Sequence, residues 1–241
     1  MKALLDKDDC ASHLVIQSRS QRFRKSLKEQ NAWIVRMALV AHAAAFAFVM
    51  FQSLGGFQFS APELTQKFQQ ILVPGLLSLG IIALTRLVLL GLIPPTFRDR
   101  VVHWKWSHPL PGARAFSRIG PRDSRVNMTR LRELHGKLPI MPAKQSQLFY
   151  SIYKQHADDV GVIDAHKSYL AARDIATINL ILLFTLPIIA GIATHDFKMA
   201  SWYAAAMLVA FLLTCLAAKA YAVRLVQNSL AVASQAKQPS P

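Results

Sequence analysis

The sequence predicts an all-α membrane protein with four transmembrane helices in two hairpins and a small helical cytoplasmic insert between the hairpins. Hydrophobic residues make up 53% of the 241 residues and charged residues only 17%, which lies outside the usual range of soluble proteins. Four continuous apolar runs are long enough to cross a hydrocarbon core of about 30 Å. The runs do not alternate apolar and polar residues, so helices fit them better than strands do.

The apolar runs and the polar segments between them divide the chain into five parts. Spans are expected over 33–54, 71–93, 175–193 and 202–218. The expected parts are a basic cytoplasmic N-terminal segment (1–32), the first transmembrane hairpin (33–93), the cytoplasmic helical insert (94–174), the second transmembrane hairpin (175–223) and a flexible cytoplasmic tail (224–241).

The distribution of lysine and arginine predicts the orientation in the membrane. Of the 28 Lys and Arg residues, 24 lie before residue 33, in the insert or from residue 219 onward. The two connections expected on the other side contain one each, Lys67 and Lys198. Because cytoplasmic loops carry an excess of Lys and Arg, we expect a multi-pass protein of the bacterial inner (plasma) membrane with both termini in the cytoplasm.

Three polar side chains are candidate intramembrane sites, because such groups are costly in lipid. They are His42, Arg86 and Asn179. Arg86, like Arg36, lies close enough to the cytoplasmic end of its span to snorkel to the head groups. For His42, nearer to the middle of the bilayer, we expect a hydrogen bond to a neighbouring helix. No span carries a polar stripe, so only an oligomer could line a pore.

Small residues recur every four positions in the fourth span, at Ala206, Ala210, Thr214 and Ala218. This spacing places them on one helix face and allows a partner helix to approach closely. We therefore expect a packing face here, used either within one bundle or between copies of the chain.

The stretch HWKWSHPLPGARAF, which starts at His103, follows directly on the second expected span. Trp104, Lys105 and Trp106 are expected at the membrane interface, where tryptophan and basic side chains are favoured. A metal site is not expected, because the five-residue spacing of His103 and His108 puts them about 140° apart on a helix. The sequence assigns no metal, cofactor or catalytic residue.

Three helices are predicted in the insert, over 123–136, 146–159 and 161–174. The first would be capped near Asp123 or Ser124 and end at Gly136. The third would continue without a break into the third span, because no Gly or Pro lies between Gly161 and Pro187. An insert of about 60 residues is small for a core of its own, so we expect it to pack on the membrane surface, the termini or another copy.

Six arginines of the insert are candidate ligand- or partner-binding residues, since guanidinium groups recognise phosphate well. They are Arg114, Arg118, Arg122, Arg125, Arg130 and Arg132. The net charge of +15 and their closeness to the bilayer favour anionic lipids as their partner. A nucleic acid or nucleotide is the less favoured alternative.

Several motifs give the insert a resemblance to a known group. They are WSHPLPGARAFS (106–117), DSRVNMTRL (123–131), LP (138–139), QSQLFYSIYK (145–154) and SYLAARD (168–174). Their order resembles that in uncharacterised bacterial four-span inner-membrane proteins with a cytoplasmic insert. Asn127 replaces an acidic residue of that group's Asp-x-Arg-x-Asp pattern, which weakens an acid-dependent role. The layout also resembles the four-span membrane effectors of anti-phage defence systems, a likeness that implies a role in antiviral defence.

The favoured function is that of a non-enzymatic inner-membrane protein whose insert docks or senses a cytoplasmic factor, as a homo-oligomer or with a cytoplasmic protein partner. Its most concrete form is an oligomeric, pore-forming defence effector that permeabilises the membrane. The alternatives are a membrane-surface enzyme acting on lipid phosphates through His103, His108 or His156, and a passive membrane anchor or scaffold subunit. The chain has no HExxH, P-loop, GxSxG or CxxC motif, so it reveals no reaction.

Overall fold

The computed structural model describes residues 27–53, 72, 75–85 and 91–235, and every regular element within them is helical. The long helices are α2 (Leu27–Ser53), α7 (Val160–Thr194) and α8 (Phe197–Gln235). Between α2 and α7 lie α4 (Pro95–His103), the 3₁₀ and π turns η1 (Pro111–Arg114), η2 (Ala115–Ile119) and η3 (Gly120–Arg122), α5 (Met128–His135) and α6 (Pro142–Gln155). The predicted all-α class is confirmed in this part of the chain.

Among the described residues, three helices are long and apolar enough to cross a membrane, namely α7, α8 and the part of α2 over Asn31–Ser53. The second expected span coincides with a shorter apolar helix, Gly75–Thr85. Residues 86–90, with the candidate Arg86, lie outside the described residues. The structure therefore supports a membrane protein with three candidate spans, and the fourth span and the pairing into two hairpins remain predictions.

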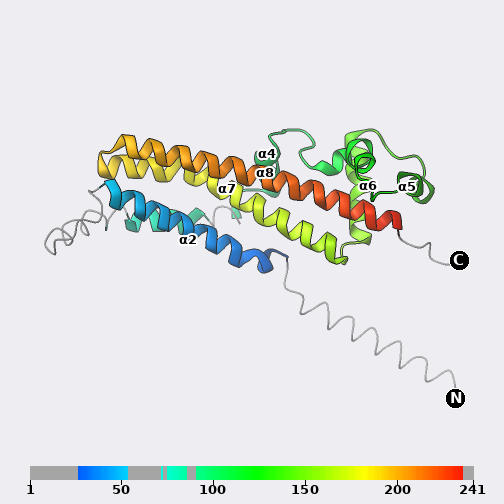
Figure 1. Cartoon of the computed structure of the whole chain (residues 1–241), viewed down its shortest axis with the longest axis horizontal. Helices are drawn as coiled ribbons and strands as arrows, with labels where there is room; N and C mark the ends of the chain where they lie inside the picture. Colours follow the sequence, from blue (N-terminus) through cyan, green and yellow to red (C-terminus); the bar gives the residue numbers. More distant parts are fainter. Residues whose placement is uncertain (1–26, 54–71, 73–74, 86–90, 236–241) are drawn as a thin grey trace, which may run out of the picture.

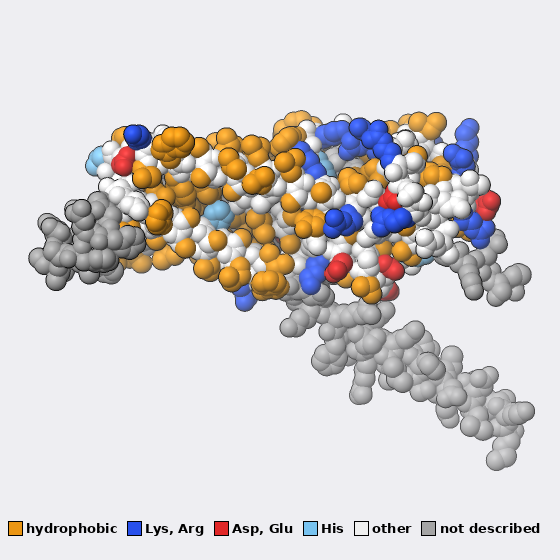
Figure 2. Space-filling view, in the orientation of Figure 1, with side chains coloured by type: hydrophobic (Ala, Val, Ile, Leu, Met, Phe, Trp, Pro, Cys, Tyr) orange, Lys and Arg blue, Asp and Glu red, His pale blue; other side chains and the backbone are white. Residues whose placement is uncertain are grey.

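The long helices turn large apolar side chains outward. Phe184, Ile188 and Leu213 are 65%, 59% and 60% exposed. Figure 2 shows hydrophobic side chains over most of the visible face of the bundle, whereas Lys and Arg gather toward the end that carries the insert. Extended apolar surface of this kind is typical of helices that contact lipid or another protein.

α7 and α8 form a long antiparallel hairpin, and α2 lies along α7 (Figure 1). The turn of the hairpin is short: His195 adopts a left-handed conformation (φ 54°), and the Asp196 side chain accepts a hydrogen bond from a backbone N–H of α8 (2.9 Å). Gly191 allows close packing there, since a β-carbon would lie 3.2 Å from Ala200 Cβ. The start of α2, the insert and the end of α8 all lie toward the opposite end of the bundle (Figure 1).

α7 runs unbroken from the insert into the apolar region, which confirms the prediction. Asp159 caps its start, because Oδ1 accepts hydrogen bonds from Gly161 N (2.9 Å) and Val162 N (3.2 Å). α7 has 35 residues and α8 has 39, whereas a bilayer requires about 20. At about 1.5 Å per residue, both helices extend roughly 20–30 Å beyond a hydrocarbon core.

The insert packs on this extension of α8. Buried side chains of the turns, α5 and α6 form one cluster with Val226, Leu230 and Ala233. The prediction of a flexible tail is therefore wrong for residues 224–235, which are helical. The physical reason is that these three side chains, three or four residues apart, form an apolar stripe that the insert covers. Of the three packing surfaces expected for the insert, the structure shows contact with a terminal segment, the end of α8.

α5 begins at Met128, later than the cap predicted near Asp123 or Ser124. Its N-cap is Asn127, whose side chain accepts a hydrogen bond from a backbone N–H one turn on (2.9 Å). Asp123 instead accepts hydrogen bonds from the backbone N–H and the guanidinium of Arg125 (3.0 and 2.8 Å). Gly136, with a φ of 72°, follows the last residue of α5 as predicted.

Candidate functional site

A buried cluster of charged side chains joins α4 to α7. Arg98 Nη1 donates to Asp174 Oδ1 (2.9 Å), and Arg173 Nη1 donates to Asp99 Oδ1 (3.1 Å). Arg173 also donates through Nε and Nη2 to Asp174 Oδ1 (3.2 and 3.1 Å). The four residues are only 1–8% exposed. Their two positive and two negative charges balance, which is the condition under which buried ions are tolerated.

Tyr169 completes this charged cluster one turn of α7 before Arg173. Its hydroxyl donates to Asp99 Oδ1 (2.7 Å), so one carboxylate oxygen receives two donors from α7. Burial and then the Asp99 charge raise the pKa of Tyr169, which keeps the phenol protonated. Burial lowers the pKa of Arg173, but Asp174 and Asp99 outweigh this effect and raise it, so the guanidinium stays charged.

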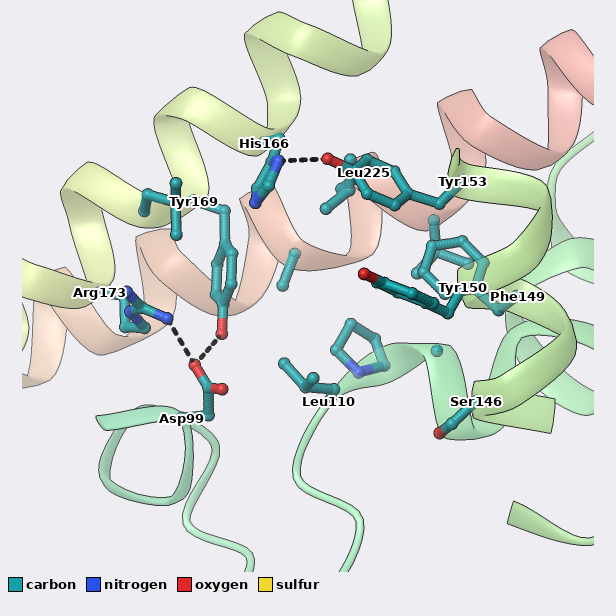
Figure 3. A pocket seen from close by; sticks show the side chains of 15 residues that line it. Asp99, Leu110, Ser146, Phe149, Tyr150, Tyr153, His166, Tyr169, Arg173 and Leu225 are labelled. Atoms are coloured by element: carbon teal, nitrogen blue, oxygen red, sulfur yellow. Dashed lines mark hydrogen bonds and ion pairs between the residues drawn. The ribbon is translucent and has the colours of Figure 1, made fainter. Parts of the chain in front are cut away.

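A cavity of about 250 Å³ lies against the charged cluster, between α6, α7, α8 and η1 (Figure 3). Aromatic rings supply much of its wall. They come from α6 and α7 and belong to Phe149, Tyr150, Tyr153, His166 and Tyr169. Because an apolar cavity of about 150 Å³ binds benzene, this aromatic cavity has room for one or two rings.

A hydrogen bond between Tyr153 and His166 crosses from α6 to α7 at the wall of the aromatic cavity (Figure 3). The hydroxyl oxygen and His166 Nδ1 are 2.8 Å apart, and the rings meet edge to face with centroids 5.3 Å apart. Burial lowers the pKa of His166, and the charge of Arg173 lowers it further. The imidazole is therefore neutral near pH 7, so this wall is polar but uncharged.

Two residues fix α6 to the turns that precede α5. Gln145 is 1% exposed, and its Oε1 accepts hydrogen bonds from Phe116 N and Ser117 N (3.1 and 3.2 Å). These N–H groups lie in the π turn η2, where the α-helical pattern of acceptors is interrupted. Gly112 of η1 lies against the ring of Phe149, since a β-carbon would approach Cδ1 to 2.6 Å. The position of α6 in the cavity wall follows from these contacts.

The predicted intramembrane residues His42 and Asn179 contact each other. His42 Nε2 and Asn179 Oδ1 are 2.7 Å apart, and Asn179 Nδ2 donates to Thr214 Oγ1 (3.1 Å). The expected hydrogen bond from His42 to a neighbouring helix is confirmed. These bonds connect α2, α7 and α8 through the apolar part of the bundle.

The six candidate arginines divide into two groups. One hollow beside α8 is lined by Arg114, Arg118 and Arg122. Arg125 and Arg130 form ion pairs with carboxylates of the insert (2.8 and 2.9 Å). Arg132 lines a different hollow. The structure thus brings only half of the predicted set together.

The predicted interface residues Trp104, Lys105 and Trp106 follow α4 directly, and all three are exposed. Trp104 adopts a left-handed conformation (φ 53°), and Lys219 Nζ lies 3.2 Å from the centroid of its ring. This cation–π contact places Trp104 next to the last apolar turns of α8.

Of the small residues predicted as a packing face, only Ala218 is buried in the chain. Ala206 is exposed, and Ala210 and Thr214 are partly buried. The buried face of α8 instead carries larger side chains at a four-residue spacing, Tyr203, Met207, Phe211 and Cys215. The small residues therefore lie beside this buried face, and their use between copies of the chain remains a prediction.

The three histidines considered for an enzyme differ in their surroundings. His103 is buried at the end of α4, His108 is exposed, and His156 follows α6. Within the described residues, no three His, Cys, Asp or Glu side chains come together as a metal site. The geometry around these histidines indicates no particular reaction.

The charged cluster and the aromatic cavity were not predicted from the sequence. A signal was present in two Arg-Asp pairs, Arg98–Asp99 and Arg173–Asp174, each next to an apolar run. Only 13 acidic residues occur in the chain, and a buried one must be paired. What the sequence could not show is that α4 returns to this point of α7.

Comparison with known proteins found no relative of this chain. No protein-family model matches the chain, and neither does any curated protein or solved structure. The resemblance of the insert to bacterial inner-membrane proteins, and of the layout to defence effectors, therefore stays a prediction.

Proposed function

We propose that this chain is a non-enzymatic membrane protein whose insert binds a cytoplasmic factor in the aromatic cavity. One observation carries the proposal: α6 of the insert forms one wall, and α7 and α8, which are long enough to cross a membrane, form the other. A ligand there would touch both parts of the molecule at once. The excess of Lys and Arg in the insert supports its cytoplasmic location.

The lining of the aromatic cavity indicates the class of ligand. Its volume of about 250 Å³ is slightly below the roughly 300–1,000 Å³ typical of pockets for drug-sized molecules. It suits a group of one or two rings, from a small molecule or from an aromatic side chain of a protein partner. Asp99 and Arg173 bind each other, so a neutral ring fits better than an ion.

The charged cluster connects the aromatic cavity to α7, so ligand binding could affect the spans through it. Tyr169 lines the aromatic cavity and also binds Asp99 of α4. One turn further along α7, Arg173 binds the same carboxylate. A ligand that displaces Tyr169 would disturb the contact between α4 and α7, and α7 continues from there into the apolar region.

Permeabilisation of the membrane, and the oligomer that it requires, remain predictions. His42, Asn179 and Thr214 hydrogen-bond to one another within one copy of the chain. The described spans therefore present no row of free polar groups that could line a pore. Ligand binding by the insert is the part of the expected function that the geometry supports best.

Filling the aromatic cavity tests this proposal. Ser146→Trp places an indole in the cavity from α6, and Gln147→Trp places the same ring on the exposed side of that helix. The full chain in detergent is incubated with cytoplasmic extract, and the retained species are identified by mass spectrometry. We expect a species held by the unaltered protein and by Gln147→Trp, with at least about tenfold less on Ser146→Trp. Equal retention by all three proteins would sink the proposal.

A further inference from the structure

The hollow beside α8 collects positive charge that no described residue neutralises. It has a volume of about 320 Å³, and Arg114, Arg118 and Arg122 line it together with Val223 and Gln227 of α8. None of the three arginines forms an ion pair with another described residue. No carboxylate is among the residues that line this arginine hollow.

The local fold explains why the three arginines share one side. They are four residues apart in the run of consecutive 3₁₀ and π turns η1, η2 and η3, and all three line the same hollow. The run is held by its other side, where Phe116 is buried in the cluster with α8. Gln145 binds the N–H groups of Phe116 and Ser117, and this contact fixes the π turn between Arg114 and Arg118.

The acidic residue nearest in sequence is not available to neutralise the arginine hollow. Asp123 follows Arg122 directly, but its two carboxylate oxygens accept hydrogen bonds from the Arg125 guanidinium at 3.1 and 2.8 Å. This hydrogen bonding lowers the pKa of Asp123, so the carboxylate stays ionised and occupied. The arginine hollow therefore keeps the charge of three cations.

Three guanidinium groups around one hollow suit a phosphate group. Each guanidinium offers parallel N–H donors that match two oxygens of a phosphate. The Gln227 amide adds an uncharged polar group to the same lining. A volume of about 320 Å³ accommodates a phosphate together with part of the group that carries it.

Along α8, the arginine hollow lies just beyond the level of the lipid head groups. Exposed apolar side chains extend from Phe197 to Leu216, which is about 30 Å at 1.5 Å per residue and matches a hydrocarbon core. Lys219 follows at this boundary. By the same rise, Val223 and Gln227 lie about 10 and 16 Å beyond Leu216. Head groups occupy roughly the first 5–8 Å outside the core, within reach of arginine side chains at this position.

We propose that the arginine hollow binds the phosphate group of an anionic phospholipid. The acyl chains would remain in the bilayer beside the exposed apolar face of α8, and the head group would lie among the three arginines. This site does not depend on the proposed function, because it shares only Pro111 with the aromatic cavity.

Native mass spectrometry of the full chain in detergent tests the lipid site. Phosphatidylglycerol is the probe, phosphatidylcholine is the comparison lipid, and inorganic pyrophosphate is the soluble competitor. We expect a 1:1 complex with phosphatidylglycerol that Arg118→Gln weakens about tenfold and the triple variant Arg114→Gln/Arg118→Gln/Arg122→Gln weakens at least about 100-fold.

The matched control removes the same charge from exposed positions of the insert outside the arginine hollow, as Arg132→Gln/Lys137→Gln/Lys144→Gln. It should bind within about threefold of the unaltered protein. Lysine at all three positions of the hollow keeps the charge but loses the paired donors, so we expect about tenfold weaker binding. Circular dichroism verifies folding, and Arg118→Gln serves alone if the triple variant does not fold.

Three outcomes would overturn this proposal. If the triple variant and its matched control weaken phosphatidylglycerol binding equally, the lipid is held only by general attraction between charges. Binding of pyrophosphate without binding of phosphatidylglycerol would assign the arginine hollow to a soluble phosphate compound. A chain that responds to neither probe has no phosphate site at this position.

Discussion

His103 is held where a positive charge is unfavourable. It is buried at the end of α4, and its Nε2 atom has no hydrogen-bond partner among the described residues. Burial lowers its pKa to about 4; Asp99 opposes this shift, and Lys219 and Arg114 add to it. Since the ordinary value is about 6.5, the unfolded chain binds more protons than the folded one between these values. Acid therefore favours unfolding at this residue.

The contribution of His103 to the free energy of unfolding should be fully present above about pH 6.5. It should be lost as the pH falls to about 4. Between pH 7.5 and 5 the loss in free energy of unfolding amounts to about 2 kcal/mol. His103→Gln should flatten this dependence, whereas His108→Gln, at an exposed imidazole, should leave it unchanged. Unfolding in detergent at the two pH values measures the effect, and an unaltered slope in His103→Gln would contradict it.

Two polar residues show what the sequence can and cannot predict at this scale. A hydrogen bond for His42 is predictable, because a lone imidazole in an apolar run needs a partner. The role of Gln145 is not, because a glutamine in an amphipathic helix has the pattern of a surface residue. Its partners Phe116 and Ser117 are 29 and 28 positions away, in a π turn that no periodicity predicts.

Among the elements, α4 and α7 are linked by charged side chains. Asp174→Asn removes one of the two anions and leaves Arg98 and Arg173 buried with the single charge of Asp99. We expect the free energy of unfolding to fall by about 3 kcal/mol. Asp164→Asn, at an exposed carboxylate of the same helix, should change it by less than about 0.5 kcal/mol. Unfolding in mixed detergent micelles measures both values.

A double variant separates charge balance from loss of contact at α4. Arg98→Leu/Asp174→Leu removes one cation and one anion, and it leaves the Arg173–Asp99 pair intact. It should recover most of the stability lost in Asp174→Asn, because no unpaired charge stays buried. If Asp174→Asn is as stable as Asp164→Asn, the charged cluster is not closed in the folded protein.

The boundaries of the elements were predictable where a single local rule decides them. The absence of Gly and Pro after Gly161 predicts the continuity of α7, and Gly136 predicts the end of α5. The helical end of α8 was not predictable, because the stripe of Val226, Leu230 and Ala233 is short and set among polar residues. Packing of the insert on this stripe is what stabilises the helix there.

For the whole molecule, we predict that the insert and the turn between α7 and α8 lie on opposite sides of the membrane. In a chain with Cys10→Ser and Cys215→Ala, single cysteines are introduced as Gln147→Cys in the insert or Lys198→Cys after the turn. A membrane-impermeant maleimide should label Lys198→Cys in intact cells and Gln147→Cys only after lysis. The reverse pattern would invert the orientation that the Lys and Arg distribution predicts.

At this largest scale, composition and apolar run length are sufficient to predict a helical membrane protein. They cannot predict the candidate site, because it depends on contacts between distant segments. Asp99 meets Arg173 across 74 positions, and Arg98 meets Asp174 across 76. Such pairings follow from how the helices pack against one another. Neither sequence repeats nor charge counts along the chain can predict that packing.

The dependence of the insert on α8 also sets an order of events during synthesis. Leu131 and Ile152 leave the ribosome well before Leu230, which completes their cluster. The interval from Ile152 is about 80 residues, or several seconds at roughly 5–20 residues per second. For that time the apolar side of the nascent insert has no partner. Its folding therefore waits for the later hairpin to be translated and inserted, and in this interval a chaperone or the lipid surface would have to shield it.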